Sequence, residues 1–170
     1  MKKTVFIAHA AIIAALYVAL TLLANGLGLA SYAIQVRFSE ALTILPFFTP
    51  AAIPGLFIGC IISNILCGSI LWDVLFGSFA TLLGAAGTYL LSRKLRAKKA
   101  NLAAFLAPLP PVIANTVIVP LVLAYAYHLE GGIPYFMLTV GIGEILSCGV
   151  LGLALLKLLQ KYQKYIFPVS

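Results

Sequence analysis

Long apolar runs separated by short polar breaks make up most of the chain. A helix needs about 20 mostly apolar residues to cross the hydrocarbon core of a bilayer, and several runs reach that length. The breaks carry glycine, proline or clustered charge, which interrupt helices. The pattern predicts one all-α domain over residues 1–170, with helices expected at 4–24, 39–48, 52–70, 73–91, 102–127 and 134–159.

Basic residues cluster beside these runs. The clusters are Lys2-Lys3, residues 93–99, and Lys157, Lys161 and Lys164. Lysine and arginine next to apolar spans mark cytoplasmic loops, so an even number of crossings must separate the first two clusters. The short helix at 39–48 must therefore cross, or largely cross, the membrane. We expect a six-transmembrane-helix bundle with cytoplasmic N and C termini, a multi-pass protein of the cell membrane.

Composition excludes several classes of function. Hydrophobic residues make up 63% of the chain and charged residues 9%, whereas soluble domains carry roughly 25% charged residues. The net charge of +7 comes from clusters beside membrane spans, so the expected partner is a lipid bilayer and not nucleic acid. The chain has no Gly-Lys-Ser/Thr phosphate loop and no room for a nucleotide-binding domain, so any ATP-driven function would need other subunits.

The sequence offers no set of catalytic residues. His9 and His128 fall on opposite sides of the predicted bundle, and no nucleophile has a matching base. Cys60, Cys67 and Cys148 lie inside apolar segments and are too scattered for a metal site, so we interpret them as packing residues. We predict no enzyme activity, no metal and no cofactor.

Polar residues gather in the outer half of the predicted bundle or near its midplane. The inner half holds few of them, which indicates a binding site open to the exterior and not a pore. Ionisable groups inside a membrane are costly and mark functional sites. The candidate substrate-binding residues are Arg37, Glu40, Asn64, Trp72, Asp73, Asn115, Tyr127 and Glu144.

Glu144 and Asn115 together could recognise a planar heterocycle. A carboxylate accepts hydrogen bonds from a ring N–H and an exocyclic amine, while an amide donates and accepts along another edge. Trp72, Tyr127 or Phe38 could stack on the ring.

Two of the carboxylates also have structural interpretations. Glu144 could simply bond to Asn115 or to a backbone carbonyl. Glu40 lies in the first turn of its predicted helix, where a carboxylate favours the helix start, and it could pair with Arg37. As a ligand-binding group Glu40, or Asp73 in its place, would pair with a cationic amine.

Small residues recur at helical spacing along the first predicted helix. They are Ala8, Ala11, Ala15 and Ala19, and also Ala10 and Ala14. Such a face lets another helix approach closely. It could serve packing inside the bundle or docking of another membrane protein, and spacing alone favours packing.

One motif resembles a known family. Residues 34–46, IQVRFSEALTILP, followed by a helix rich in proline and glycine, resemble the QueT family. These are substrate-binding S components of energy-coupling factor (ECF) transporters for queuosine precursors. The resemblance extends over essentially the whole chain, including its length and expected six helices.

The resemblance implies that the protein captures a 7-deazaguanine, such as the 7-aminomethyl form or queuine, from the exterior. The loop at residues 30–38 would close over it. The protein would then dock on a transmembrane coupling subunit driven by two cytosolic ATPase subunits, and release its cargo inside. By analogy with the family's alanine docking motif, Ala11 and Ala15 would lie on the docking face.

Two alternatives stay open. The protein could be an S component for another vitamin or small heterocycle, because S components share a fold while their ligands differ. It could also be a small stand-alone secondary transporter. That function would need a polar path through the inner half, and the internal repeats typical of many such transporters are not evident.

Overall fold

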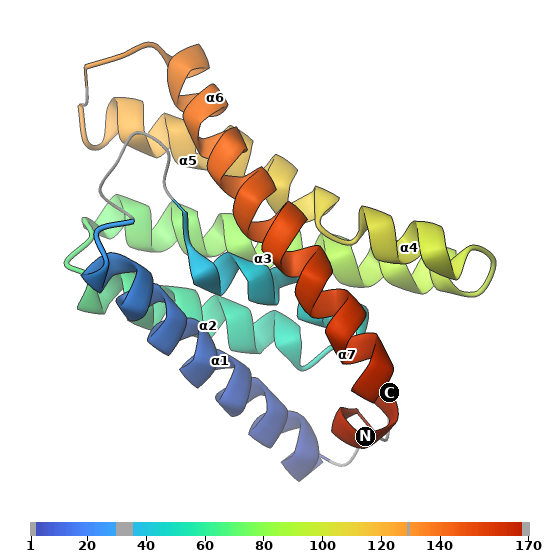
Figure 1. Ribbon diagram of the computed structural model, residues 1–170. Helices are drawn as coiled ribbons and strands as arrows, with labels where there is room; N and C mark the ends of the chain where they lie inside the picture. Colours follow the sequence, from blue (N-terminus) through green and yellow to red (C-terminus); the bar gives the residue numbers. More distant parts are fainter. Residues whose placement is uncertain (1–2, 30–35, 129, 168–170) are drawn as a thin grey trace.

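The computed structural model describes residues 3–29, 36–128 and 130–167 (Figure 1). The described residues form helices joined by short turns. Their bounds are α1 Lys3–Gly26, the 3-10 helix η1 Phe38–Phe47, α2 Ala52–Leu66, α3 Leu71–Arg96, α4 Ala100–Leu106, α5 Leu109–Tyr125, α6 Ile133–Glu144, the π-helical segment η2 Ile145–Leu151 and α7 Gly152–Ile166. Lys2 of the first basic cluster and residues 30–35 of the predicted closing loop lie outside the described residues.

The all-helical class expected from the sequence is confirmed. Four helical runs in the described residues are long and apolar enough to cross a membrane: Lys3–Gly26, Leu71–Arg96, Ala100–Tyr125 and Ile133–Ile166. The other two, Phe38–Phe47 and Ala52–Leu66, are shorter. The helix expected at 102–127 is broken between α4 and α5, where Pro108, Pro110 and Pro111 follow one another closely. These helices make the chain a multi-pass membrane protein.

The short helix η1 lies at the centre of the bundle. Every residue from Ser39 to Phe47 is buried, and α1, α2, α3, α7 and η2 all contact the helix. With ten residues, η1 is long for a 3-10 helix. Long 3-10 helices are uncommon because their hydrogen bonds are poorly aligned. Packing on all sides therefore stabilises η1 more than its own backbone bonds do.

Close backbone contacts join the helix pairs around η1. A Cβ added to Gly59 of α2 would lie 2.8 Å from the Cβ of Tyr17 and 3.0 Å from the carbonyl oxygen of Ala14 in α1. One added to Gly84 of α3 would lie 2.6 Å from the Cα of Pro111 in α5. Small residues bring helices together by van der Waals contact, which is the main attraction between helices in lipid.

The break between α4 and α5 is satisfied from a neighbouring helix. Pro111 has no N–H to donate to the carbonyl of Ala107, four residues earlier. The hydroxyl of Thr88 in α3 donates to that carbonyl instead, at 2.8 Å. Proline is tolerated in a membrane helix when a neighbouring side chain satisfies the freed carbonyl in this way.

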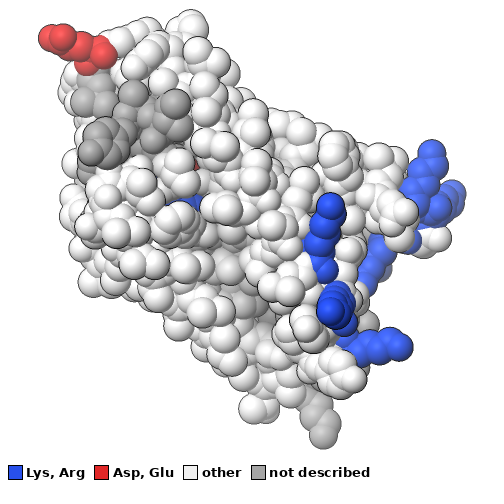
Figure 2. All heavy atoms as spheres, in the orientation of Figure 1, with Lys and Arg blue, Asp and Glu red and all other residues white. Residues whose placement is uncertain are grey.

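Both ends of the described chain lie at the same end of the bundle (Figure 1). The ring centroids of His9 and Phe167 are 6.0 Å apart. Lysine and arginine side chains gather at this end, over α7 and the α3–α4 turn, and the exposed acidic side chain lies at the opposite end (Figure 2). The bundle is therefore electrostatically polarised along its length.

Replacing Gly84 with alanine tests the tight contact between α3 and α5. The added methyl group cannot fit against the backbone of Pro111, and overpacking of this kind costs about 1–3 kcal/mol. We expect a lower melting temperature for Gly84→Ala in detergent. Gly149→Ala is the control, because a Cβ there meets its nearest atom at 3.7 Å. Equal melting temperatures for the two variants would contradict the close contact.

Candidate ligand-binding site

A polar cavity of about 230 Å³ opens at the end of the bundle away from the basic clusters. The end of α1, the start of α3, the end of α5 and the residue before η1 contribute to its wall. Its lining residues are Thr21, Ala24, Asn25, Arg37, Cys67, Ser69, Asp73, Val119, Leu123 and Tyr127.

Asp73 and Tyr127 form one polar wall of this cavity. The hydroxyl of Tyr127 donates to Oδ2 of Asp73 at 3.2 Å and accepts from the backbone N–H of Ile70 at 3.4 Å. Partial burial, together with the Asp73 carboxylate, raises the pKa of Tyr127 above its ordinary value. The hydroxyl therefore stays protonated and holds the carboxylate in place at the start of α3.

Arg37 lies at the cavity wall just before η1. Its backbone N–H donates to Oγ of Ser147 in η2 at 3.2 Å, which fixes the start of η1 against the last long helical run. Among the described residues the structure shows no salt bridge between Arg37 and Glu40. The residue lines the cavity together with Asp73 and Tyr127.

A buried hydrogen-bond network surrounds Glu40, which the chain places three residues further into η1. The hydroxyl of Tyr17 in α1 donates to Oε1 of Glu40 in a short hydrogen bond. The amide of Asn115 in α5 lies 3.4 Å from Oε2, and Thr43 donates to the Glu40 carbonyl at 2.6 Å. Glu40 is 2% exposed, so these donors replace the water that a buried carboxylate loses.

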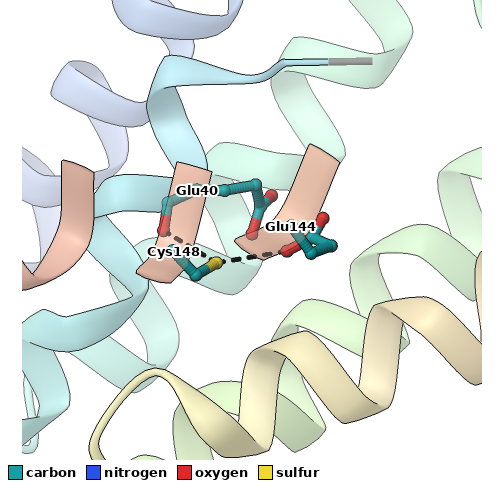
Figure 3. A group of neighbouring side chains, drawn as sticks. All are labelled: Glu40, Glu144 and Cys148. Carbon is teal, nitrogen blue, oxygen red and sulfur yellow. Dashed lines mark hydrogen bonds between the residues drawn. The ribbon is translucent and has the colours of Figure 1, made fainter. Parts of the chain in front are cut away.

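Glu144 and Cys148 lie next to Glu40 (Figure 3). The thiol of Cys148 lies 3.1 Å from Oε2 of Glu144 and 3.4 Å from the carbonyl of Glu40. One ligand atom from each of the three residues lies within 4.8 Å of the others. Two unit charges about 5 Å apart repel by about 3 kcal/mol at an effective dielectric constant of about 20, so this pair favours a proton or a cationic group between them.

The local helix geometry explains how these groups meet. Glu144 and Cys148 are four residues apart and share a helix face. The wider π-helical turns of η2 begin at Ile145, and π-helical turns inside α-helices are frequent at functional sites. In this turn Ser147 bonds to Arg37 and Cys148 reaches η1, so η2 contacts η1 at both points.

Glu40, Glu144 and Cys148 also raise the question of a metal ion. Both carboxylate oxygens of Glu40 already accept hydrogen bonds, from Tyr17 and Asn115, and the Cys148 thiol lies within donating distance of Glu144. These contacts form a connected hydrogen-bond network and do not direct free ligand atoms at a common centre. We assign no metal to them.

The structure divides the predicted site residues into groups. Arg37, Asp73 and Tyr127 line the cavity, whereas Glu40, Asn115 and Glu144 are buried, and the first two are hydrogen-bonded to each other. Their roles in substrate binding stay predictions.

Asn64 lies close to the cavity wall and Trp72 does not. The Asn64 amide is 3.5 Å from Sγ of Cys60. A Cβ on Gly77 would lie 3.5 Å from that amide and 3.4 Å from Oδ1 of Asp73, so both side chains lie over this glycine. Trp72 is 56% exposed and stacks on Phe76 with centroids 6.0 Å apart. The structure does not bring it to the cavity.

Sequence reasoning missed several members of the network. Tyr17 lies on the buried stripe of α1 with Ala14 and Thr21, and its spacing from Ala14 and Thr21 was a signal that could have identified it. Cys148 had a similar signal, because it lies four residues after Glu144. Nothing in the sequence pattern indicates Thr43 or Ser147.

The alanines of α1 divide between two faces. Ala14 is buried against α2, where Gly59 approaches its backbone. Ala8, Ala11, Ala15 and Ala19 are exposed. Internal packing therefore uses one small-residue stripe and leaves the other on the surface.

The fold and the cavity together define a multi-pass membrane protein with a polar cavity at one end. The chain matches the QueT transporter family over residues 7–161, and it belongs to that family. The family is one of transporters. This membership confirms the resemblance seen in residues 34–46.

One curated relative is "Queuosine precursor transporter QueT" from Lactococcus lactis subsp. cremoris (strain MG1363), which is 47% identical over 84 residues. The match covers 48% of this chain and 48% of the relative, so the chain spans about half the length of the curated relative that it matches. No solved structure matches the chain.

Removing the Tyr17 hydroxyl tests the network around Glu40. Tyr17→Phe leaves Glu40 without one donor, and loss of a hydrogen bond to a buried charged group costs about 1.5–3 kcal/mol. We expect a clear loss of thermal stability, measured on the purified protein. Tyr125→Phe is the control, since Tyr125 is 68% exposed. A melting temperature unchanged in both variants would show that Tyr17 does not support Glu40.

Proposed function

We propose that this protein is the substrate-capture subunit of an ECF-type importer in the cell membrane and that it binds a queuosine precursor. Membership of the QueT transporter family and the printed name of the relative support this function. The chain carries no phosphate-binding loop of its own, which agrees with energy supplied by separate ATPase subunits.

The network around Glu40 is the observation that carries the proposal, and it adjoins the cavity because Thr21 of the cavity wall donates to Ser39, the neighbour of Glu40. A 7-deazaguanine presents a ring N–H and an exocyclic amine on one edge, and a carboxylate accepts from both. Glu40 and Glu144 place two carboxylates near each other in a buried setting. The cationic amine of the 7-aminomethyl form would offset their repulsion, so this form fits the site better than a neutral precursor.

The dimensions of the cavity favour a small ligand. Its volume of about 230 Å³ lies below the roughly 300–1,000 Å³ of typical small-molecule sites. A bicyclic ring with a short substituent fits that space better than a large vitamin does. The proposal that residues 30–38 close over the ligand remains a prediction.

The orientation of the protein follows from its charge. Basic residues mark the cytoplasmic side, which would put α7 and the α3–α4 turn inside. Both termini would then be cytoplasmic, and the polar cavity would face the exterior. A substrate-capture subunit requires this arrangement.

The exposed alanines of α1 are the proposed docking face for the transmembrane coupling subunit. Ala11 and Ala15 are one turn apart, and both are exposed. A surface of small side chains lets a neighbouring helix approach closely in lipid. The two cytosolic ATPase subunits would then act through the coupling subunit.

The ligand proposal is tested by calorimetry on the purified protein with 7-aminomethyl-7-deazaguanine, the neutral 7-cyano form, guanine and common vitamins. We expect the aminomethyl form to bind most tightly. Glu144→Gln should weaken its binding at least about tenfold, equivalent to about 1.4 kcal/mol. Glu130→Gln, in an exposed loop, is the control.

Tight binding of an unrelated vitamin and none of a deazaguanine would overturn the assigned ligand. An unchanged affinity in Glu144→Gln would remove Glu144 from the site. Uptake into vesicles that contain this chain alone would favour a secondary transporter.

Enlarging the alanine face tests docking separately from binding. Ala11→Trp or Ala15→Trp should leave ligand affinity unchanged, because both residues lie away from the cavity. Either change should abolish uptake in cells that supply the coupling subunit and ATPases, since a large side chain prevents close approach. Ala154→Trp is the control, because Ala154 is an exposed alanine in α7. Normal uptake by the α1 variants would refute this docking face.

A further inference from the structure

A second groove lies at the basic end of the bundle, remote from the ligand cavity. It runs between the last turns of α3 and the segment that joins η1 to α2, and its volume is about 420 Å³. The end of α3 supplies its polar wall and the end of η1 its apolar wall.

Two arginines give the groove its charge. Arg93 and Arg96 both line it, and they are three residues apart on α3, which places them on the same face of the helix. None of the four acidic side chains of the protein lines the groove. The positive charge is therefore not neutralised by a carboxylate in the groove itself.

Arg96 is held in position by η1. Its guanidinium donates to the carbonyl of Phe47 at 3.1 Å and lies 4.8 Å from the centroid of the Phe47 ring. One donor on the guanidinium is thus occupied, and an arginine has five N–H donors in a fixed planar arrangement. The remaining N–H donors belong to a guanidinium group that Phe47 already holds in place.

A buried hydroxyl without a partner lies beside the arginines. Ser92 lines the groove, is 2% exposed, and its Oγ has no hydrogen-bond partner in the structure. A serine in a membrane helix usually bonds to the carbonyl four residues earlier. This hydroxyl is a donor that an anion in the groove could use.

The opposite wall of the groove is apolar and aromatic. Pro46, Phe47 and Phe48 belong to it. An inorganic anion gains nothing from such a wall, whereas the glycerol and first acyl carbons of a lipid would bury apolar surface against it. Basic pockets between membrane helices bind the head groups of anionic lipids.

We propose that this groove binds the phosphate head group of an anionic phospholipid, with Arg93 and Arg96 on the phosphate and the acyl chains along the apolar wall. Guanidinium and phosphate form two parallel charge-assisted hydrogen bonds, which are among the stronger polar contacts in proteins. A bound lipid would join α3 to the end of η1 at the membrane surface. This site shares no lining residue with the substrate cavity.

The proposal is tested with the full-length protein in detergent, titrated with phosphatidylglycerol, phosphatidylcholine or inorganic phosphate. Native mass spectrometry measures retained lipid and a thermal shift measures stabilisation. We expect retention and stabilisation with phosphatidylglycerol, and little of either with phosphatidylcholine. Arg93→Gln/Arg96→Gln should weaken phosphatidylglycerol binding by about tenfold or more.

Lys157→Gln/Lys161→Gln is the matched control, because it removes two exposed charges from the same end of the molecule. Equal loss in both double variants would show general attraction to anionic lipid and overturn the site. Equal stabilisation by inorganic phosphate would make the occupant a free anion. If Arg93→Gln/Arg96→Gln unfolds, Arg93→Gln is used alone, because it changes only the exposed arginine. Unchanged binding of phosphatidylglycerol by Arg93→Gln would refute the proposal. Binding of phosphatidylglycerol only to the complex with the coupling subunit would show a protein interface instead.

Discussion

The hydrogen bonds to Glu40 are the interaction on which the arrangement of the bundle depends. A carboxylate that is 2% exposed in an apolar bundle must find donors within the protein. It finds them in Tyr17 of α1 and Asn115 of α5, while Cys148 of η2 lies against its backbone. Three segments distant in sequence are thus directed toward one residue of η1. Because packing in lipid gains little from the hydrophobic effect, such polar contacts define which faces meet.

Hydropathy and charge predicted the helical class and the basic end, because both depend on the local sequence alone. Helix rotation could not be predicted. Trp72 and Asp73 are neighbours in sequence, yet successive residues of a helix point about 100° apart, and the structure buries Asp73 while Trp72 faces outward. The sequence shows that both are unusual in an apolar run. Only the contacts of α3 with α2 and α5 decide which one turns inward.

The break between α4 and α5 shows a second limit of prediction. Closely spaced prolines favour a distorted helix, but Thr88 of another helix accommodates the distortion, because its hydroxyl donates to the carbonyl of Ala107. No pattern within residues 102–127 contains that information. The candidate site has the same property, because Thr43 and Ser147 enter it through contacts between elements far apart in sequence.

The central helix η1 connects the two ends of the molecule. Arg37, just before η1, lines the polar cavity, and Phe47, its last residue, lines the basic groove and holds Arg96. A 3-10 helix rises about 2 Å per residue, so η1 spans roughly 20 Å between these positions. Its residues from Ser39 to Phe47 are buried, and it contacts α1, α2, α3, α7 and η2 along its length. A single packed helix therefore joins the residue that lines the cavity, Arg37, to the residue that holds Arg96, Phe47.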